Sequence, residues 1–153
     1  MQIDVPLTDP QLEFCTSEDC FPAIIGGLGS GKSRGGTMRL LLLLLSDRGT
    51  NGGYYMPTYD LLKLRAITGV EEDLNALGLS YSLNKSDYEI KIHGYGSIIF
   101  RSYDRPERII AYETAHSIVD ELDTLPKDKA ALVWRKISER NRQKCSKPNS
   151  IAC

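Results

Sequence analysis

The chain has 153 residues, which is enough for one domain with its own core and too few for two domains of ordinary size. A formal net charge of -1 gives no general attraction to nucleic acid or to anionic membranes, so any polyanionic partner must be bound by a local patch. The apolar run from Leu40 to Leu45 is far shorter than the roughly 20 residues that a membrane span needs. We therefore expect no membrane partner.

The first elements in chain order lead to a glycine-rich segment. "TDPQLEF" favours a helix that Asp9 caps, with Pro10 at its first position. "FPAIIGG" predicts a short strand buried on both faces, and the segment "GGLGSGKS" follows it directly. From Lys32 to about Ser46 the residues favour a helix, and its leucines cover more than one face, so we expect it to be buried between layers.

The second half of the chain continues the alternation of strands and helices. Residues 53–56 predict a strand stopped by Pro57, followed by a helix from about Tyr59 and a short helix that ends near Gly78. "YEIKIHGYGSIIFRS" predicts a hairpin, because apolar and polar residues alternate on both sides of "GYG". "HSIVDEL" predicts a buried strand, "KDKAALVWRKISERNRQK" a long helix with a basic tail, and "KPNSIAC" a turn before another buried strand.

This alternation predicts an α/β protein, a three-layer sandwich with a mainly parallel central sheet and an added β-hairpin. Because the sequence stops within a predicted strand, we expect residues 1–153 to be a fragment of a longer protein. The four cysteines, at positions 15, 20, 145 and 153, form no C-x-x-C pair and have no histidine near them in the sequence, so we expect free thiols and no zinc. His93 and His116 are given no functional role.

The segment "GGLGSGKS" fits the G-x-x-x-x-G-K-[ST] spacing of a phosphate-binding loop, and it lies between a predicted strand and a predicted helix, as that motif requires. Its glycines let successive N–H groups turn toward a phosphate. Lys32 is expected to reach the β- and γ-phosphates, and the Ser33 hydroxyl to bind Mg²⁺. The alternative is a chance glycine turn before a helix. The predicted ATP-binding residues are Gln11, Gly26, Gly27, Leu28, Gly29, Ser30, Gly31, Lys32 and Ser33.

Two acids follow the predicted strand "HSIV". Asp120 and Glu121 would emerge at the carboxyl edge of the sheet, where ligands bind in open α/β folds. Asp120 is expected to hold Mg²⁺ with Ser33, and Glu121 to polarise the attacking water. Acids that cap a helix are the alternative for such a pair. With the loop upstream, the acids predict a Mg²⁺-dependent ATPase of the P-loop, RecA-like (ASCE) class.

Gln11 completes the predicted nucleotide site, because a primary amide can both donate to and accept from an adenine edge. The alternative is an ordinary exposed glutamine on a helix. If Gln11 reads the base, ATP is preferred over GTP.

The order of Gln11, "GGLGSGKS", "YMPTYDLL" and "RPERIIAYETAHSIVDELD" resembles the amino-terminal ATPase domain of the terminase large subunit, the DNA-packaging motor of tailed bacteriophages. The resemblance implies a homo-oligomeric ring at the procapsid portal in the host cytoplasm, hydrolysing ATP to move double-stranded DNA. It implies the portal protein and the small terminase subunit as partners, and a coupling segment and a nuclease domain beyond Cys153.

The chain departs from that family at two positions. Leu28 lies where many members have an arginine, and Ile110 lies where several have an arginine finger that enters the neighbouring subunit's site. Arg108, or Arg105 beside it, can take that role, because a finger needs reach and charge more than one fixed offset. For either arginine, a surface ion pair with Asp104 or Glu107 is the alternative.

Other interpretations stay open. "DELD" at residues 120–123 also fits a DExD-type helicase or translocase, and a nucleotide-gated interaction module would bind ATP without depending on hydrolysis. Six cations from Arg135 to Lys147, against Glu139 alone, predict either a DNA-phosphate or subunit contact or a solvated helix end.

Overall fold

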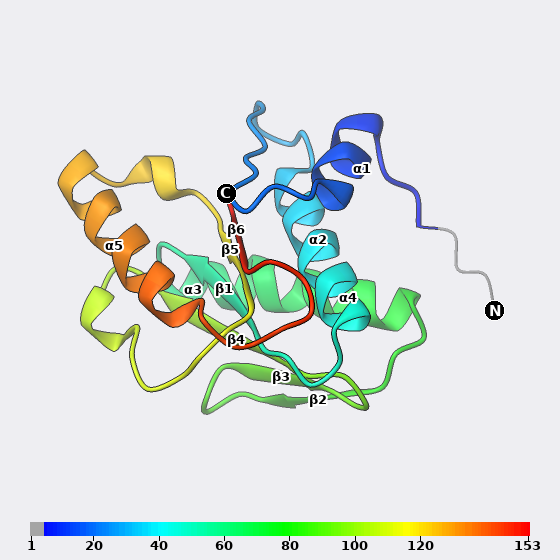
Figure 1. The fold of residues 1–153 in the computed structure, drawn as a ribbon. Helices are drawn as coiled ribbons and strands as arrows, with labels where there is room; N and C mark the ends of the chain where they lie inside the picture. Colours follow the sequence, from blue (N-terminus) through cyan, green and yellow to red (C-terminus); the bar gives the residue numbers. More distant parts are fainter. Residues whose placement is uncertain (1–4) are drawn as a thin grey trace.

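A six-stranded sheet runs through the middle of the molecule, with helices on both of its faces (Figure 1). The computed structural model describes residues 5–153. The strands are β1 (Gly52–Met56), β2 (Tyr81–Asn84), β3 (Glu89–Ile92), β4 (Ser97–Ser102), β5 (His116–Val119) and β6 (Ser150–Ala152), in the order β2-β3-β4-β1-β5-β6. Neighbours among β4, β1, β5 and β6 pair in parallel, whereas β2 and β3 are antiparallel additions. The predicted mainly parallel sheet with an added hairpin is confirmed.

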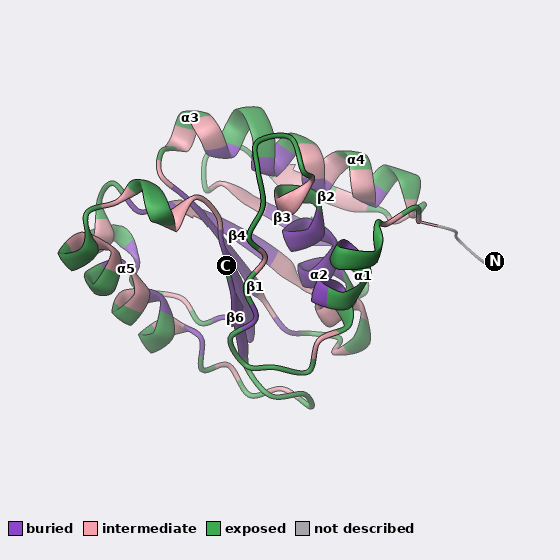
Figure 2. Ribbon diagram, turned by 90° about the horizontal axis from the view of Figure 1, so that it is seen from above, coloured by how far each residue is buried: buried purple, intermediate pink, exposed green. Residues whose placement is uncertain are grey.

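The helices divide between the two faces. One face carries α1 (Asp9–Thr16), α2 (Lys32–Ser46), α3 (Tyr59–Leu61), the π-helical segment η1 (Leu62–Ile67) and α4 (Thr68–Ala76); the other carries α5 (Lys127–Arg140). Figure 2 shows the buried strands between these layers. Two short 3-10 turns, η2 (Pro106–Arg108) and η3 (Leu122–Thr124), complete the described elements. Within residues 5–153, none of the helices is both long and apolar enough to cross a membrane.

The molecule has two apolar cores, one on each face of the sheet, because successive side chains of a strand point to opposite faces. On β1, Tyr54 and Met56 face the core beneath α2 and α4, whereas Tyr55 faces the core with Val133 and Ile137 of α5. Successive residues of a strand point to opposite faces, so a strand with a helix layer on each side must be apolar throughout. Every residue of β1 is accordingly buried.

Helix α2 has the bounds that its residues predict and lies between the sheet and α1, as expected. Its buried side chains include one cation, Arg39, which is 1% exposed. The Arg39 guanidinium donates to the carbonyls of Phe14 (2.7 Å) and Ser17 (2.9 Å) and to the Ser150 hydroxyl (3.1 Å). It thereby satisfies carbonyls at the end of α1 and ties that end to β6.

Several predicted boundaries need correction. Thr8, not Asp9, is the N-cap of α1. The helices expected separately after Tyr59 and near Gly78 form one continuous helical run through Ala76, which Thr58 caps by accepting from the Leu61 N–H at 3.3 Å. β2 was not predicted. Helix α5 ends at Arg140, so the rest of the expected basic tail lies in the following loop.

The expected strand at "PAII" is also wrong in part. Residues 20–24 run beside β6: Ile151 N–H donates to the Cys20 carbonyl (2.9 Å), and Ile24 N–H donates to that of Cys153 (2.9 Å). Pro22 lacks the N–H that would complete this ladder. Phe21 and Ile25 are 65% and 96% exposed, so the segment is an extended edge rather than a strand buried on both faces.

Candidate ATP-binding and hydrolysis site

The glycine-rich loop joins this edge segment to the first turn of α2. Gly29 and Gly31 have φ of +74° and +82°, the left-handed conformation that glycine adopts without a steric penalty. The Lys32 Nζ donates to the carbonyls of Gly26 (2.6 Å) and Gly27 (2.8 Å), so the lysine side chain lies along the inside of the loop. Leu28 is fully exposed at the tip.

Gln11 lies directly against this loop. Its Nε2 donates to the Gly31 carbonyl at 2.8 Å, and its Oε1 accepts from the Thr8 N–H at 2.9 Å. A side chain at Gly31 would begin 2.5 Å from the Gln11 Nε2, so the close approach depends on that glycine. Gln11 is 6% exposed, and the alternative of an ordinary exposed glutamine is wrong. Its contact with adenine stays a prediction.

The two predicted acids follow β5 directly. The Tyr54 hydroxyl donates to the Asp120 Oδ2 at 3.3 Å, and the Tyr103 hydroxyl donates to the Asp120 carbonyl at 2.6 Å. Burial, and then the negative charge of Asp120, raise the pKa of Tyr54, so this tyrosine stays a neutral donor. The neutral Tyr54 hydroxyl therefore orients the Asp120 carboxylate by donating a hydrogen bond to it.

Glu121 has a strained backbone, with φ of +59° although it is not glycine. Such a conformation costs roughly 1–3 kcal/mol and is found most often at functional sites. The Thr124 hydroxyl donates to the Glu121 carbonyl at 2.7 Å and helps to hold the turn. The turn directs the Glu121 side chain toward Arg65 of η1, whose Nη1 donates to the Glu121 Oε1 at 2.8 Å.

Arg65 is a residue that sequence reasoning missed. It lies in the π-helical segment between α3 and α4, and such segments occur frequently at functional sites. No pattern in the sequence distinguishes Arg65 from the other surface arginines, because its partner Glu121 comes from a distant strand end. A π-helical turn also has no strong local signature from which it could have been expected.

A cavity of about 300 Å³ connects the start of α2 with the residues that hold the two acids. Its lining includes the predicted metal ligand Ser33, together with Tyr54, which binds Asp120, and Arg65, which binds Glu121. Helix α2 can pack closely on β5 at this point because Gly36 has no side chain. A Cβ at Gly36 would lie 3.0 Å from the Ile118 Cγ2. The Ser33 hydroxyl and the Asp120 carboxylate are oxygen ligands of the kind that Mg²⁺ prefers.

Arg108 lies away from this cavity. It is exposed in η2 and lines a separate hollow of about 470 Å³ with Tyr59, Lys63 and Arg101. Among residues 5–153, neither Arg105 nor Arg108 forms an ion pair, so the expected surface pairs with Asp104 or Glu107 do not occur there. Ile110 is 55% exposed. The role of Arg108 as a finger stays a prediction.

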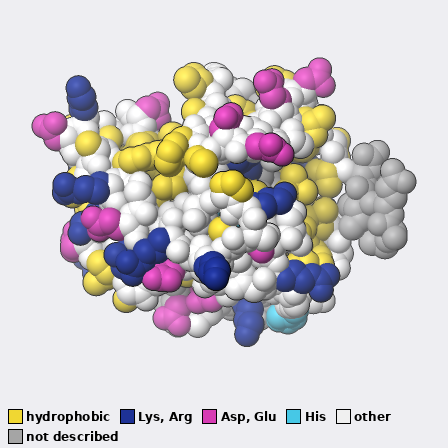
Figure 3. All heavy atoms as spheres, in the orientation of Figure 1, with side chains coloured by type: hydrophobic (Ala, Val, Ile, Leu, Met, Phe, Trp, Pro, Cys, Tyr) yellow, Lys and Arg dark blue, Asp and Glu magenta, His cyan; other side chains and the backbone are white. Residues whose placement is uncertain are grey.

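The basic tail is divided between α5 and the loop after it. Lys136 lies 3.9 Å from Glu139, and the Arg142 Nε donates to the Glu113 Oε1 at 2.8 Å. Figure 3 shows Lys and Arg side chains on the side of the molecule that carries α5, at the left of the view, with acidic side chains between them. The patch is therefore mixed in charge rather than a continuous basic stripe.

Although no histidine is near a cysteine in the sequence, the fold brings His116 close to Cys145. The ligand atoms of Asp47, His116 and Cys145 lie within 4.8 Å of one another. They come from the end of α2, the start of β5 and the loop before β6, so their sequence spacing gives no indication of the contact.

Comparisons with known proteins place the fold. Neither a protein-family profile nor a curated protein matches the chain. Among solved structures, it resembles the large terminase of a thermophilic bacteriophage in complex with ADP, with a TM-score of 0.74 and 18% identity over 96% of this chain. For the same terminase in complex with ATP-γ-S, the TM-score is 0.70 and the sequence identity is 14% over 97% of this chain. For the large terminase ATPase domain of Thermus phage P74-26, the TM-score is 0.68 and the identity is 19% over 96% of this chain.

These likenesses confirm the α/β fold class: the chain has the same fold as the corresponding part of these large terminase structures. The chain spans 38% of each of the two nucleotide-bound terminase chains and 64% of the P74-26 ATPase domain.

Proposed function

We propose that the chain is the ATP-hydrolysing motor domain of a viral DNA-packaging terminase. The observation that carries the proposal is that Ser33, at the start of α2, shares a cavity with Tyr54 and Arg65, the residues that bind Asp120 and Glu121 at the carboxyl end of β5. The resemblance to terminases in complex with ADP and ATP-γ-S supports a nucleotide as the ligand of this site.

ATP binding would use the loop first. The Lys32 Nζ would exchange the carbonyls of Gly26 and Gly27 for phosphate oxygens, and the first N–H groups of α2 would face the same anion. Leu28 supplies no charge, so Lys32 is the cation that the loop itself contributes. Gln11, already seated against Gly31, would lie where the adenine base enters.

Hydrolysis would depend on the acids at the end of β5. The Ser33 hydroxyl and the Asp120 carboxylate would hold Mg²⁺, which when bound neutralises charge on the phosphates. Glu121 would accept a hydrogen bond from the attacking water and orient it toward the γ-phosphate. Arg65 would hold the Glu121 carboxylate in position before the water binds, because the Arg65 Nη1 donates to the Glu121 Oε1 at 2.8 Å.

A packaging motor also requires partners that act across subunits. We propose a homo-oligomeric ring at the procapsid portal in the host cytoplasm, with double-stranded DNA, the portal protein and the small terminase subunit as partners. Arg108, exposed and without an ion pair among residues 5–153, would reach the ATP of the neighbouring subunit.

Mixing two inactive variants tests this arrangement. Arg108→Ala lacks the finger but retains Glu121, and Glu121→Gln lacks the water-orienting acid but retains Arg108. If Arg108 acts on a neighbouring site, a mixture hydrolyses ATP faster than either variant alone, and the rate per subunit rises with protein concentration. Lys127→Ala, a change at an exposed lysine outside the site, is the control and should hydrolyse ATP normally alone. Fast hydrolysis independent of concentration, or a mixture no faster than its components, would contradict the ring.

A further inference from the structure

A cluster of metal-ligating side chains lies at the opposite end of β5 from the ATP site. Asp47 follows α2 as its C-cap, His116 begins β5, and Cys145 lies in the loop that leads to β6. His116 and Asp120 are four residues apart on an extended strand, which separates them by roughly 13 Å. The cluster is therefore distinct from the Mg²⁺ ligands proposed above.

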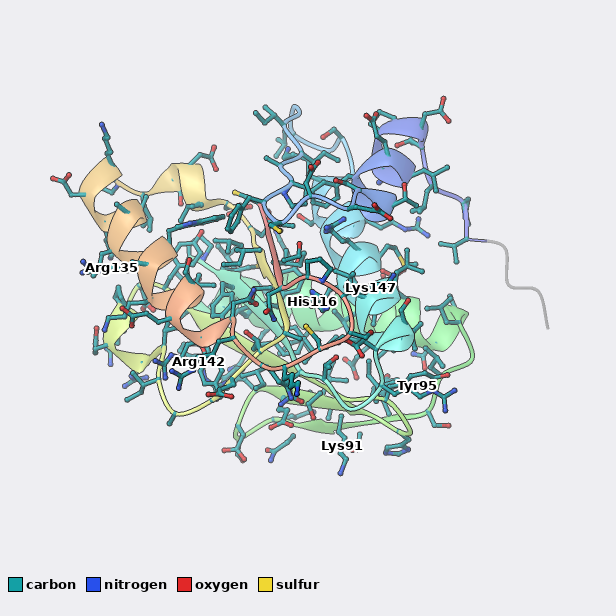
Figure 4. The ribbon with its side chains drawn as sticks, in the orientation of Figure 1. Lys91, Tyr95, His116, Arg135, Arg142 and Lys147 are labelled. Carbon is teal, nitrogen blue, oxygen red and sulfur yellow. The ribbon has the colours of Figure 1, made fainter. Side chains whose placement is uncertain are left out.

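His116 is the unusual member of this cluster. It is 0% exposed, yet neither its Nδ1 nor its Nε2 has a hydrogen-bond partner in the part of the chain that the structure describes. A buried polar group without a partner costs on the order of 1–3 kcal/mol, so such groups need an explanation. Figure 4 shows His116 behind the loop that joins α5 to β6, with Lys147 on the α2 side of that loop. A ligand between His116, Asp47 and Cys145 would supply the missing partner.

The surroundings favour a cation with these three ligands. The Asp47 Oδ2 accepts from the Ser146 N–H at 2.6 Å, and the Asn149 amide donates to the Cys145 Sγ at 3.3 Å. Hydrogen bonds of this kind orient metal ligands from outside. Neither ring nitrogen of His116 has a hydrogen-bond partner among residues 5–153, so the imidazole can offer a lone pair to a cation.

We propose that Asp47, His116 and Cys145 form a structural Zn²⁺ site that joins the end of α2, the start of β5 and the loop before β6. One nitrogen, one thiolate and one carboxylate suit Zn²⁺, whereas Mg²⁺ and Ca²⁺ prefer oxygen ligands alone. A carboxylate and a thiolate also balance the two positive charges of the ion. A water molecule completes the tetrahedron.

Zinc binding would require the three ligand atoms to move only slightly closer together. Tetrahedral zinc with ordinary bond lengths places its ligand atoms roughly 3.5 Å apart, whereas those of the cluster lie within 4.8 Å of one another. Cys145 lies in a loop and is partly exposed, so its thiol can move toward the two other ligands. The thiol donates to the Lys147 carbonyl at 2.9 Å, and zinc binding would replace that proton and release it.

Cobalt substitution tests the proposal, because Co²⁺ replaces Zn²⁺ and a thiolate bound to it gives a charge-transfer band in the near ultraviolet. After treatment with a chelator, the chain should bind a single Co²⁺ with this band, and Zn²⁺ should displace it. Cys145→Ser should abolish the band, and Asp47→Asn should weaken binding by about tenfold or more. Cys20→Ser, which removes an exposed thiol outside the cluster, is the control and should retain the band.

Thermal unfolding separates loss of the site from loss of the fold. In the absence of metal, Cys145→Ser should unfold at the temperature of the parent chain, and Zn²⁺ should raise only the parent's unfolding temperature. ATP binding should be the same in both, so failure of this proposal is distinguishable from failure of the proposed function. Absence of the band in the parent, its persistence in Cys145→Ser, or its equal loss in Cys20→Ser would each overturn the zinc site.

Discussion

At the scale of single residues, the candidate site depends on side chains whose positions are fixed by their neighbours. Asp120 is oriented by Tyr54, Glu121 by Arg65, and Gln11 by the contacts at both ends of its amide. Each contact joins segments that are far apart in the sequence, except that between Gln11 and Thr8. The sequence motifs single out the acids, the lysine and the serine as candidate site residues, whereas no motif indicates the residues that orient them.

Replacing Arg65 should affect hydrolysis more than binding. Arg65→Gln removes the charged partner of Glu121, so we expect kcat to fall by roughly tenfold while KM for ATP changes little, because the contact orients the water-activating group and not the nucleotide. Arg65→Lys should restore part of the rate. Steady-state phosphate release measures both constants. Lys63→Gln, an exposed change on the same π-helical segment, is the control, and an equal loss in it would refute a specific role for Arg65.

Replacing Arg39 should affect stability. Arg39→Met retains much of the apolar volume but leaves the carbonyls of Phe14 and Ser17 without their donor, which should lower the free energy of unfolding by roughly 3 kcal/mol. Urea unfolding followed by circular dichroism measures this change. Arg34→Met is the matched control in the same helix: Arg34 is half-exposed, and its 3.9 Å pair with Asp73 should contribute less than about 1 kcal/mol. Equal losses in the two variants would show that Arg39 contributes no more than a surface arginine.

At the scale of elements, local patterns predicted the helices and the inner strands well. Helix α2 has the predicted bounds because its helix-forming residues and its buried apolar side chains agree. The segment at residues 20–25 departs from its prediction because Pro22 cannot donate to β6 and nothing among residues 5–153 covers Ile25. The site at Asp47, His116 and Cys145 was not predictable, since three different elements bring those residues together.

The packing of α2 on β5 can be tested with two glycines. Gly36→Ala and Gly69→Ala gain the same helix propensity, about 1 kcal/mol, but only at Gly36 does the new Cβ meet a neighbour, 3.0 Å from Ile118. We expect Gly69→Ala to raise the free energy of unfolding and Gly36→Ala to leave it unchanged or lower it. Denaturant unfolding of both variants gives the difference, which should be about 1 kcal/mol. Equal stabilisation by both changes would mean that α2 does not depend on this close approach.

At the scale of the whole molecule, the sheet brings two motifs of distant sequence position to one edge. The glycine loop precedes α2, the acids follow β5, and α2 packs across β5, so the order of elements determines where the nucleotide would bind. The fold class was predictable because strands and helices alternate along the chain. The role proposed for Arg108 between subunits could not be predicted from these patterns, because a contact with another subunit involves no second segment of this chain.

The proposed motor function requires that Lys32 binds ATP and that Glu121 is needed only for its hydrolysis. ATP affinity and single-turnover phosphate release, measured for the parent chain, Lys32→Ala and Glu121→Gln, separate these two roles. We predict that Lys32→Ala binds ATP at least about tenfold more weakly. Glu121→Gln should bind ATP as the parent does but release phosphate more slowly by about 100-fold or more. Phosphate release by Glu121→Gln at the parent rate would rule out the proposed role of Glu121 and favour a nucleotide-gated interaction module.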